Sequence, residues 1–209
     1  KRLCVDTGYF ETFNKVNVHL IDLNSSPIKR IGESLIEADQ EYEIDTLILA
    51  TGFDAMTGAL TSLDIIGRKG IVLRDQWKQG AKSYLGLGVS NFPNLFTITG
   101  PGSPSVLSNM MPSIEQHVNW IADCINWMID NNKNVIESSI TAEEEWMSLV
   151  NEIAGMTIFK STESWYNGSN IDNKAKAFLP FIGVPMYTEK LDEITENNYQ
   201  GFVFDVSNK

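Results

Sequence analysis

The sequence predicts an α/β protein, and three patterns along the chain support this fold class. A short, uninterrupted apolar run at residues 47–50 is typical of a strand covered on both faces, and Thr51 ends it. A second strand-like run, at residues 95–99, enters a loop rich in glycine, proline and serine. Apolar residues then recur at helical spacing over residues 114–128. Strands that alternate with a long helix are typical of the α/β class.

The first fifty residues are predicted to form short strands joined by a turn. Residues 16–21 alternate apolar and polar side chains, as a half-buried strand does. The Asn, Ser and Pro side chains of residues 24–27 predict a turn, and residues 28–31 are expected to return as a partner strand. Residues 42–45 then lead on to the apolar run at residues 47–50.

The middle of the chain is predicted to contain loops and two helices. Six glycines punctuate residues 55–94, so we expect loops with short strands there, such as one at residues 70–73. The first helix is expected to end near Asn131. A capping-box pattern, with Thr141 as N-cap and Glu144 at the third helical position, predicts the start of the second helix.

The carboxyl-terminal part is predicted to be a long loop followed by two short elements. Residues 157–183 are rich in Ser, Asn and aromatic side chains and are expected to form the loop. An amphipathic helix is predicted over residues 186–197, and residues 201–204 are predicted to close the chain as a short strand or extended tail.

The composition argues against several classes of protein. The chain has 209 residues, 43% of them hydrophobic, and a formal net charge of −11, whereas nucleic-acid binding needs a basic surface. Cys4 and Cys124 are too few for a disulfide framework and are expected to be reduced in a cytoplasmic protein. No apolar run approaches the length of a membrane span, and no signal peptide opens the chain. The chain opens in mid-pattern without an initiator methionine, so we expect a fragment of a longer polypeptide.

The start of the long helix is the first candidate binding site. A strand, a glycine-rich turn and a helix in that order present unpaired backbone N–H groups at one point, which can hold a phosphate or another negatively charged group. A second candidate is the motif at residues 50–54, because ligands of open α/β sheets bind beyond the carboxyl ends of strands. An ordinary turn after a strand explains the same motif equally well.

Other motifs have structural explanations. Residues 86–91 resemble the first half of a dinucleotide fingerprint but lack the third glycine and a following helix, so we interpret them as a structural loop. His117 is expected to be a half-buried, hydrogen-bonded histidine, and His19 to face solvent. No spacing of His, Cys, Asp and Glu suggests a metal site, and no nucleophile–base pair is evident. Trp165 is either a buried anchor or a flat side chain that covers a cofactor.

Four segments together resemble one family, and they occur in its order and at its separations. The whole set resembles the carboxyl-terminal part of type I Baeyer–Villiger monooxygenases, the cyclohexanone and phenylacetone monooxygenase group, from residue 1 to about residue 205. The segments are residues 1–14, 50–54, 100–120 and 164–170.

The resemblance implies a Rossmann-like flavoprotein with two dinucleotide-binding domains. Such enzymes bind FAD tightly and use NADPH, and their reduced flavin reacts with O2 to give a peroxyflavin that converts a ketone into an ester or lactone. By resemblance, residues 1–50 are the end of the NADP-binding domain, and residues 51–209 are the carboxyl-terminal part of the FAD-binding domain. The remaining partner would be the rest of the same polypeptide.

The resemblance also implies roles for individual residues. Met110 would contact the flavin, and Trp165 would contact NADP. The other cofactor-binding residues would be Asn109, Thr51 and Asp54, and the substrate pocket would be lined by Ser105, Val106 and Leu107. The family's catalytic arginine and both glycine-rich fingerprints belong before Lys1, so no residue of this chain is assigned a catalytic role.

Two alternatives stay open. The first is another class B flavin monooxygenase that oxygenates nitrogen or sulfur, although the Trp-Tyr-x-Gly-Ser-Asn loop at residues 165–170 favours the Baeyer–Villiger group. The second is a non-catalytic remnant of the fold. The run after Asn170 departs from the Pro-Gly-Lys-Pro-Arg-like pattern of the family, which leaves the closing geometry of that loop open.

Overall fold

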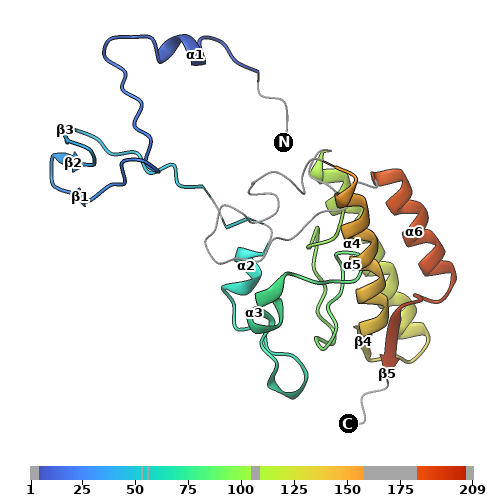
Figure 1. Cartoon of the computed structure of the whole chain (residues 1–209). Coiled ribbons are helices and arrows are strands. Elements are labelled where there is room, and N and C mark those ends of the chain that lie inside the picture. The colour runs from blue at the N-terminus through green and yellow to red at the C-terminus, as the bar shows by residue number, and fades with distance from the viewer. Residues whose placement is uncertain (1–4, 53, 56, 105–108, 158–182, 206–209) are drawn as a thin grey trace. The chain divides into compact units, whose positions relative to one another are not determined.

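The structure is a computed structural model that describes residues 5–52, 54–55, 57–104, 109–157 and 183–205 (Figure 1). The chain divides into two compact units, Lys1–Gly52 and Phe53–Lys209. The boundary between the units lies within the motif at residues 50–54. Whether the units are parts of NADP- and FAD-binding domains stays a prediction.

The first unit contains one short helix and one small sheet. The helix and strands are α1 (Tyr9–Thr12), β1 (Arg30–Ile31), β2 (Leu35–Glu37) and β3 (Glu41–Glu43). The strands pair antiparallel in the order β1-β2-β3, with Ile31 opposite Ile36 and Ile36 opposite Tyr42. Ala38 is the single buried residue among the described residues of this unit, so the sheet has almost no core of its own.

The two strands expected on either side of this sheet are not formed. Residues 16–21 form a turn and irregular backbone, and Val16 is 97% exposed. Residues 47–50 form no strand in the described part of the chain, and Ile48 is 82% exposed. A strand needs a neighbour for its backbone groups, and the described residues provide none here. The turn at residues 24–27 is confirmed: the Ser26 N–H donates to the Asp22 carbonyl oxygen at 2.8 Å.

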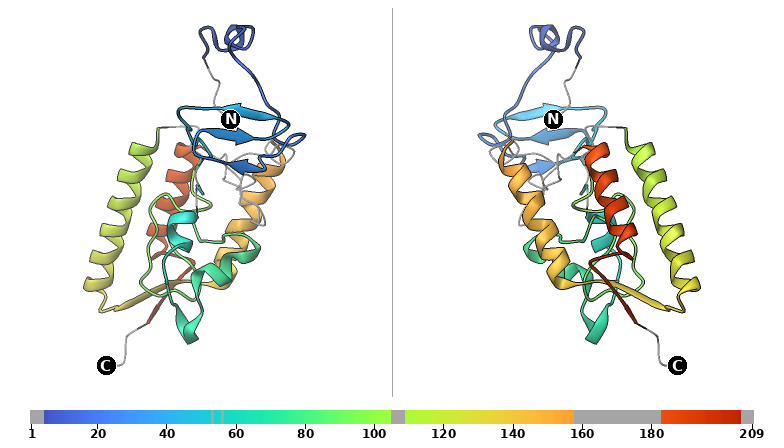
Figure 2. Two further views of the ribbon diagram at one scale, coloured as in Figure 1. Left: turned by 90° about the vertical axis from the view of Figure 1, so that its left-hand side faces the viewer. Right: turned by 90° about the vertical axis from the view of Figure 1, so that its right-hand side faces the viewer.

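The described part of the second unit holds three long helices and a two-stranded sheet. In Figure 2, α6 lies between α4 and α5; hydrogen bonds join it to α4, and a ring contact joins it to α5. Strands β4 and β5 pair antiparallel, with Ile136 opposite Phe204. The elements are α2 (Gly58–Thr61), α3 (Leu73–Gln76), α4 (Met110–Asp130), β4 (Val135–Ser138), α5 (Ile140–Gly155), α6 (Val184–Glu196) and β5 (Phe202–Asp205). Short 3-10 turns cover Arg68–Gly70 and Trp77–Gln79.

The helix predictions are confirmed, with one correction to a helix start. Helices α4 and α6 begin and end within a few residues of the predicted positions. Helix α5 begins two residues earlier than expected, because Ser139 and not Thr141 is the N-cap. Its Oγ accepts a hydrogen bond from the Ala142 N–H at 3.1 Å, so the Thr141–Glu144 pair does not form the capping box.

The strand predictions in this unit are mostly wrong. Residues 95–99 contain a single bridge residue, Phe96, which pairs with Gly88. Residues 70–73 likewise contain one bridge, from Val72 to Ile66, and short helices occupy much of residues 55–94. Strand β5 is confirmed, and its partner β4 was not predicted. The loop expected at residues 157–183 lies almost wholly outside the described residues.

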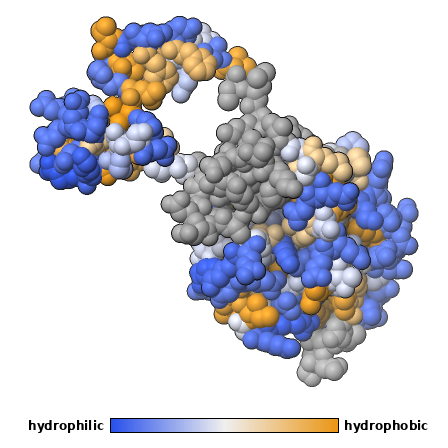
Figure 3. Space-filling view, in the orientation of Figure 1, coloured by the Kyte–Doolittle hydropathy of each residue, from blue (hydrophilic) through white to orange (hydrophobic). Residues whose placement is uncertain are grey.

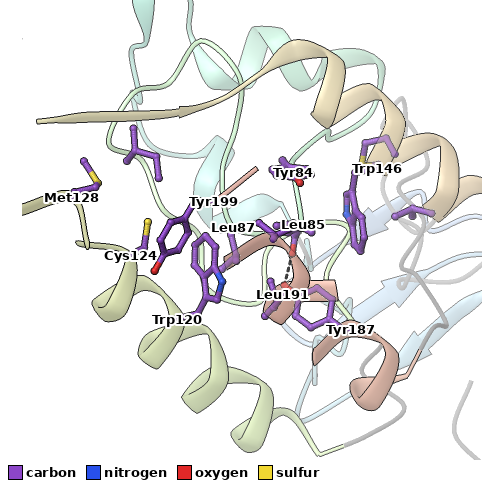
Figure 4. Close-up of a cluster of buried hydrophobic side chains, with 14 residues drawn as sticks. Tyr84, Leu85, Leu87, Trp120, Cys124, Met128, Trp146, Tyr187, Leu191 and Tyr199 are labelled. Atoms are coloured by element: carbon purple, nitrogen blue, oxygen red, sulfur yellow. Dashed lines mark hydrogen bonds between the residues drawn. The ribbon is translucent and has the colours of Figure 1, made fainter. Parts of the chain in front are cut away.

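The core of the second unit lies between its three long helices and the loop at residues 84–88 (Figure 4). Its fourteen buried members are Tyr84, Leu85, Leu87, Trp120, Cys124, Met128, Ile136, Trp146, Met147, Val150, Tyr187, Leu191, Ile194 and Tyr199. A second cluster contains Leu73, Trp77, Ala81, Val89 and Phe92. The loop between the two clusters is therefore buried, which is unusual because every backbone polar group in it needs a partner.

Side chains supply several of those partners. The Tyr187 hydroxyl of α6 donates to the Leu85 carbonyl oxygen at 2.6 Å, and the Ser83 hydroxyl accepts a hydrogen bond from the Gly86 N–H at 3.0 Å. Gly86 has φ of 74°, and a Cβ at this position would lie 2.6 Å from the Ser103 Cβ. The interpretation of residues 86–91 as a structural loop is confirmed.

Candidate cofactor-binding site at the start of helix α4

Helix α4 offers fewer free donors at its start than the sequence pattern predicted. Asn109 is the N-cap, and its Oδ1 accepts a hydrogen bond from the Met111 N–H at 3.1 Å. Pro112 occupies the third helical position and has no N–H. Of the first four backbone positions, only those of Asn109 and Met110 can therefore offer an N–H to a ligand.

The electrostatic environment at this helix start suits an anionic or electron-rich group. The first turn of α4 contains no acidic side chain, whereas the first turn of α5 contains Glu143. The positive end of the α4 dipole is therefore not neutralised by its own side chains. The Ser113 hydroxyl, in the first turn, is buried and has no hydrogen-bond partner among the described residues. A buried hydroxyl without a partner is uncommon and is compatible with a bound group that supplies one.

The backbone that precedes α4 is held by buried polar side chains. His117 accepts a hydrogen bond at Nδ1 from the Thr99 N–H, 2.9 Å away, and its Nε2 lies 3.0 Å from the Tyr187 hydroxyl. The expectation of a hydrogen-bonded histidine is confirmed, although His117 is fully rather than half buried. Burial lowers the pKa of His117 to about 4, so the ring is neutral near pH 7. His19 is exposed, as expected.

The structure describes four of the residues proposed to bind cofactor or substrate. Asn109 is exposed and Met110 half-buried, both at the start of α4. Asp54 is exposed in the same unit, and its Cγ would lie 2.7 Å from a Cβ added to Gly58, so Gly58 leaves room for this carboxylate. Thr51 is exposed and belongs to the first unit. The remaining proposed site residues lie outside the described part of the chain: Ser105, Val106, Leu107 and Trp165.

Two pockets are lined by described residues, and none of the proposed site residues lines either. A pocket of about 480 Å³ lies between residues 75–91 and the start of α5 and includes Glu143. Burial raises the pKa of Glu143, but both carboxylate oxygens accept hydrogen bonds from Ser90, from its N–H at 2.8 Å and its hydroxyl at 2.9 Å. Glu143 thus links α5 to the buried loop. The second pocket, about 250 Å³, lies between α4 and α6.

The described residues offer neither a metal cluster nor a membrane-spanning helix. No group of three or more His, Cys, Asp or Glu side chains in the described part of the chain could hold a metal ion. No described helix combines the length and the apolarity that a bilayer crossing requires.

Comparisons with known proteins give a consistent family. No family model matches the chain. Cyclohexanone 1,2-monooxygenase from Acinetobacter sp is 39% identical over 205 residues, which are 97% of the chain and 37% of that protein. Phenazine N-monooxygenase PhzNO1 from Lysobacter antibioticus is 38% identical, over 97% of the chain and 38% of that protein. A Baeyer–Villiger monooxygenase from Pseudooceanicola batsensis is 38% identical, over 98% of the chain and 38% of that protein.

Solved structures agree with the sequence comparisons. Cyclohexanone monooxygenase from Rhodococcus sp. Phi1 bound to NADP+ matches with a TM-score of 0.91 and 34% identity, over 99% of this chain and 39% of that chain. OTEMO in complex with FAD and NADP matches with a TM-score of 0.89 and 33% identity, over 98% of this chain and 38% of that chain. These matches confirm the α/β fold class.

The matched relatives are much longer than the chain. The chain spans 37–38% of the length of these curated relatives, and the similarity extends over almost the whole of the chain. The three relatives named here carry out oxygenation reactions according to their names, and two of those names belong to the Baeyer–Villiger group. The chain belongs to the family of type I Baeyer–Villiger monooxygenases.

Proposed function

We propose that the chain is part of an FAD- and NADPH-dependent monooxygenase that inserts one oxygen atom from O2 beside a ketone carbonyl, giving an ester or lactone. The observation that carries this proposal is the similarity to cyclohexanone 1,2-monooxygenase over 97% of the chain at 39% identity. A neighbour of known structure contains FAD and NADP, which supports both cofactors. Because the chain spans about two fifths of its relatives, the activity is proposed for the whole protein that carries it.

The start of α4 is the part of the described chain that we assign to the flavin. Bound FAD would supply the activation of O2, and NADPH would supply the electrons. Met110 would pack against the flavin ring, and the N–H groups of Asn109 and Met110 would donate to its electron-rich edge. Ser113 could donate its unpaired hydroxyl proton to the same group or to an intervening water. The absence of an acidic side chain in this turn keeps the local field favourable to negative charge.

The other assignments follow the family pattern. We assign Ser105, Val106 and Leu107 to the substrate pocket, Trp165 to NADP, and Thr51 and Asp54 to the cofactors. In the same scheme, residues 1–50 complete an NADP-binding domain and residues 51–209 an FAD-binding domain. The ketone and O2 would be the small-molecule partners, and the rest of the same polypeptide the macromolecular one. The cytoplasm, where NADPH is available, would be the compartment.

The proposal is tested with the full protein that carries this chain. We expect the purified protein to retain yellow FAD, and cyclic ketones such as cyclohexanone to stimulate its oxidation of NADPH. Mass spectrometry should then find the corresponding lactone carrying one ¹⁸O atom from ¹⁸O2. A flavoprotein that oxidises NADPH without forming any ester or lactone from a broad ketone panel would contradict the proposal.

A second candidate activity is the oxygenation of a ring nitrogen. The phenazine N-monooxygenase is 38% identical to the chain, almost as similar as the cyclohexanone enzyme. The two candidates are separated by running phenazine and ketone panels in parallel on the same preparation. Formation of an N-oxide without any ester would favour the second activity, and the assignment of residues 105–107 to a ketone pocket would then be withdrawn.

The pocket assignment is tested with Leu107→Ala. If Leu107 lines the pocket, the substitution should enlarge it and shift selectivity toward bulkier ketones by about 10- to 200-fold, the range expected for a lost apolar contact. The FAD content should stay constant, because the flavin contact is assigned to the start of α4. Ile129→Ala is the matched control, since Ile129 is 66% exposed near the other end of α4. An unchanged substrate profile with intact flavin would place Leu107 outside the pocket.

A further inference from the structure

Two fully buried polar side chains connect the backbones of two loops in the second unit. Both His117 of α4 and Tyr187 of α6 are 0% exposed. The His117 Nδ1 lies 2.9 Å from the Thr99 N, and its Nε2 lies 3.0 Å from the Tyr187 hydroxyl oxygen. The same hydroxyl lies 2.6 Å from the Leu85 carbonyl oxygen, a contact drawn in Figure 4. The series of hydrogen bonds thus runs from the Thr99 N–H to the Leu85 carbonyl oxygen.

The two backbone groups at the ends of this series of hydrogen bonds determine where every proton in it lies. A backbone N–H can only donate, so the His117 Nδ1 must be the unprotonated acceptor for Thr99. A backbone carbonyl can only accept, so the Tyr187 hydroxyl must give its one proton to Leu85. The Nε2–H of His117 therefore donates to the Tyr187 oxygen. Each polar atom has a partner, and neither side chain keeps a free proton to donate.

The bond from His117 closes the base of the loop that leads into α4. Thr99 begins the loop, the loop enters α4 at Met110, and His117 projects back from the second turn of the same helix. Thr99 has φ of 51°, a left-handed conformation that residues other than glycine seldom adopt. Such a conformation persists where the surroundings over-determine it, and the His117 bond is one such constraint.

Other bonds hold the loop further along, and they come from different elements. Ser83 binds the Pro101 carbonyl oxygen, and Trp146 of α5 binds the Gly102 carbonyl oxygen. Of these three side chains, His117 is the member of α4, so its bond connects the loop to that helix. It therefore fixes the loop relative to the helix start that we assign to the flavin.

We propose that His117 and Tyr187 are positioning residues that fix the loop at residues 99–104 against helix α4. This proposal rests on the proposed function, in which the following residues 105–107 line the substrate pocket and Met110 meets the flavin. Tyr187 orients the His117 ring, and His117 holds Thr99. A displacement of about 1 Å between reacting groups can lower a rate roughly 100-fold, so loss of this bond should act on the reaction without removing any contact to substrate.

Two amide substitutions separate the two bonds of the histidine. In His117→Asn, the amide oxygen can take the place of Nδ1 and still accept from Thr99, while the bond to Tyr187 is lost. In His117→Gln, the longer amide reaches the place of Nε2 and Tyr187, while Thr99 loses its acceptor. The proposal therefore predicts that Asn preserves the loop and Gln does not. Ile125→Ala is the control, because Ile125 is a partly exposed residue of α4.

The structural readout is hydrogen exchange of the Thr99 amide in the full protein, which needs no catalytic activity. We expect His117→Gln to accelerate this exchange at least 10-fold relative to the wild type, and His117→Asn to change it less than 3-fold. Equal exchange rates in the Asn and Gln variants would overturn the proposal. If the variants fail to fold, nitrogen NMR of wild-type His117 decides: a protonated Nδ1 would overturn the proposal and a protonated Nε2 would support it.

The functional readout is the split between kcat and the KM for NADPH, measured with a ketone as the substrate at constant FAD content. We expect His117→Gln to lower kcat 10- to 100-fold, with KM for NADPH within 2-fold, and His117→Asn to recover most of the loss. Tyr187→Phe should fall between them. Equal loss in both amide variants, in proportion to lost FAD, would indicate a merely structural role and overturn the proposal. If the wild-type protein oxygenates no ketone, the proposed function fails, and Thr99 exchange alone decides whether His117 holds the loop.

Discussion

The two units of the chain differ in how much of their apolar surface they bury. The described part of the first unit buries only Ala38, and Figure 3 shows apolar surface over α1. The described part of the second unit buries twenty hydrophobic residues, which include two aromatic-rich clusters. Burial of apolar surface is the main favourable contribution to folding. The second unit therefore carries its own source of stability, whereas the first unit has few internal contacts to stabilise it.

The units also use polar side chains in different ways. In the first unit, Arg30 pairs with Glu37 and Glu41, and its side chain is 56% exposed. In the second unit, buried side chains such as His117 and Trp146 bind single backbone groups. Exposed ion pairs contribute little and are screened by salt, while the loss of a buried hydrogen bond leaves a polar group unsatisfied. The four predictions below test this contrast, from the largest effect to the smallest.

The largest effect is expected for a core residue of the second unit compared with an apolar residue of the first. Trp146→Ala should lower the free energy of unfolding by about 3–5 kcal/mol, because it opens a cavity and removes the bond to Gly102. Ile48→Ala should change it by less than about 0.5 kcal/mol, since Ile48 is 82% exposed. Urea unfolding followed by far-ultraviolet circular dichroism measures both. Comparable losses for the two variants would show that the first unit has a core of its own.

The next effect is a pH dependence that originates in the second unit. Burial lowers the pKa of His117 to about 4. Between pH 6.5 and pH 4, the unfolded chain therefore binds a proton at this histidine and the folded chain does not. Stability from this group is complete above pH 6.5 and falls as the pH drops to 4, by roughly 3 kcal/mol in total. Glu143 acts in the opposite sense, because its raised pKa makes the folded state bind a proton first as the pH falls.

The variant His117→Asn isolates the histidine contribution from that of Glu143. Urea midpoints of the wild type and the variant, measured between pH 7 and pH 4, should converge as the pH falls. This is expected because only the wild type loses stability through the histidine. A stability difference that stays constant over this range would mean that His117 titrates normally in the folded protein.

The contrast between the units also separates what the sequence can predict from what it cannot. The three long helices follow from periodic apolar residues, because helix hydrogen bonds are local and need no distant partner. The strands expected at residues 16–21, 47–50 and 95–99 are wrong, because a strand forms only beside another strand. A continuous apolar run indicates that a segment tends to be buried, but it does not reveal whether this chain contains the strands that would pair with it.

The candidate site was predictable in part for the same reason. The helix start at Met110 follows from local pattern, and so does the N-cap Asn109. Pro112 was visible in the sequence and already removes one of the expected donors. The pairing of His117 with Tyr187 joins residues 70 positions apart, and no local pattern encodes it. The strand β4 was not predictable from alternation either, because its two buried residues are one apolar and one polar side chain, Ile136 and Ser138, and the sequence therefore shows no period of two.

A smaller effect is expected at the cap of α5. Ser139→Ala should destabilise the second unit by about 1 kcal/mol, because the Ala142 N–H loses its acceptor at the helix start. Thr141→Ala is the matched control and should cost clearly less, since Thr141 is an exposed helical residue and not the cap. Thermal unfolding of the two variants makes the comparison. A larger loss of stability for Thr141→Ala would mean that Thr141 is the N-cap, as the sequence pattern predicted.

The smallest effect is expected for the ion pairs of the first unit. Arg30 contacts Glu37 at 3.4 Å and Glu41 at 3.2 Å, and all three side chains are a third or more exposed. Arg30→Ala should therefore change the free energy of unfolding by no more than about 1 kcal/mol, and added salt should reduce the difference further. Amide exchange of β1 and β2 in low and high salt measures this locally, since Arg30 and Glu37 face each other across those strands. A large, salt-independent acceleration of exchange would mean that Arg30 contributes strongly to the sheet, and the contrast in how the two units use polar side chains would then be wrong.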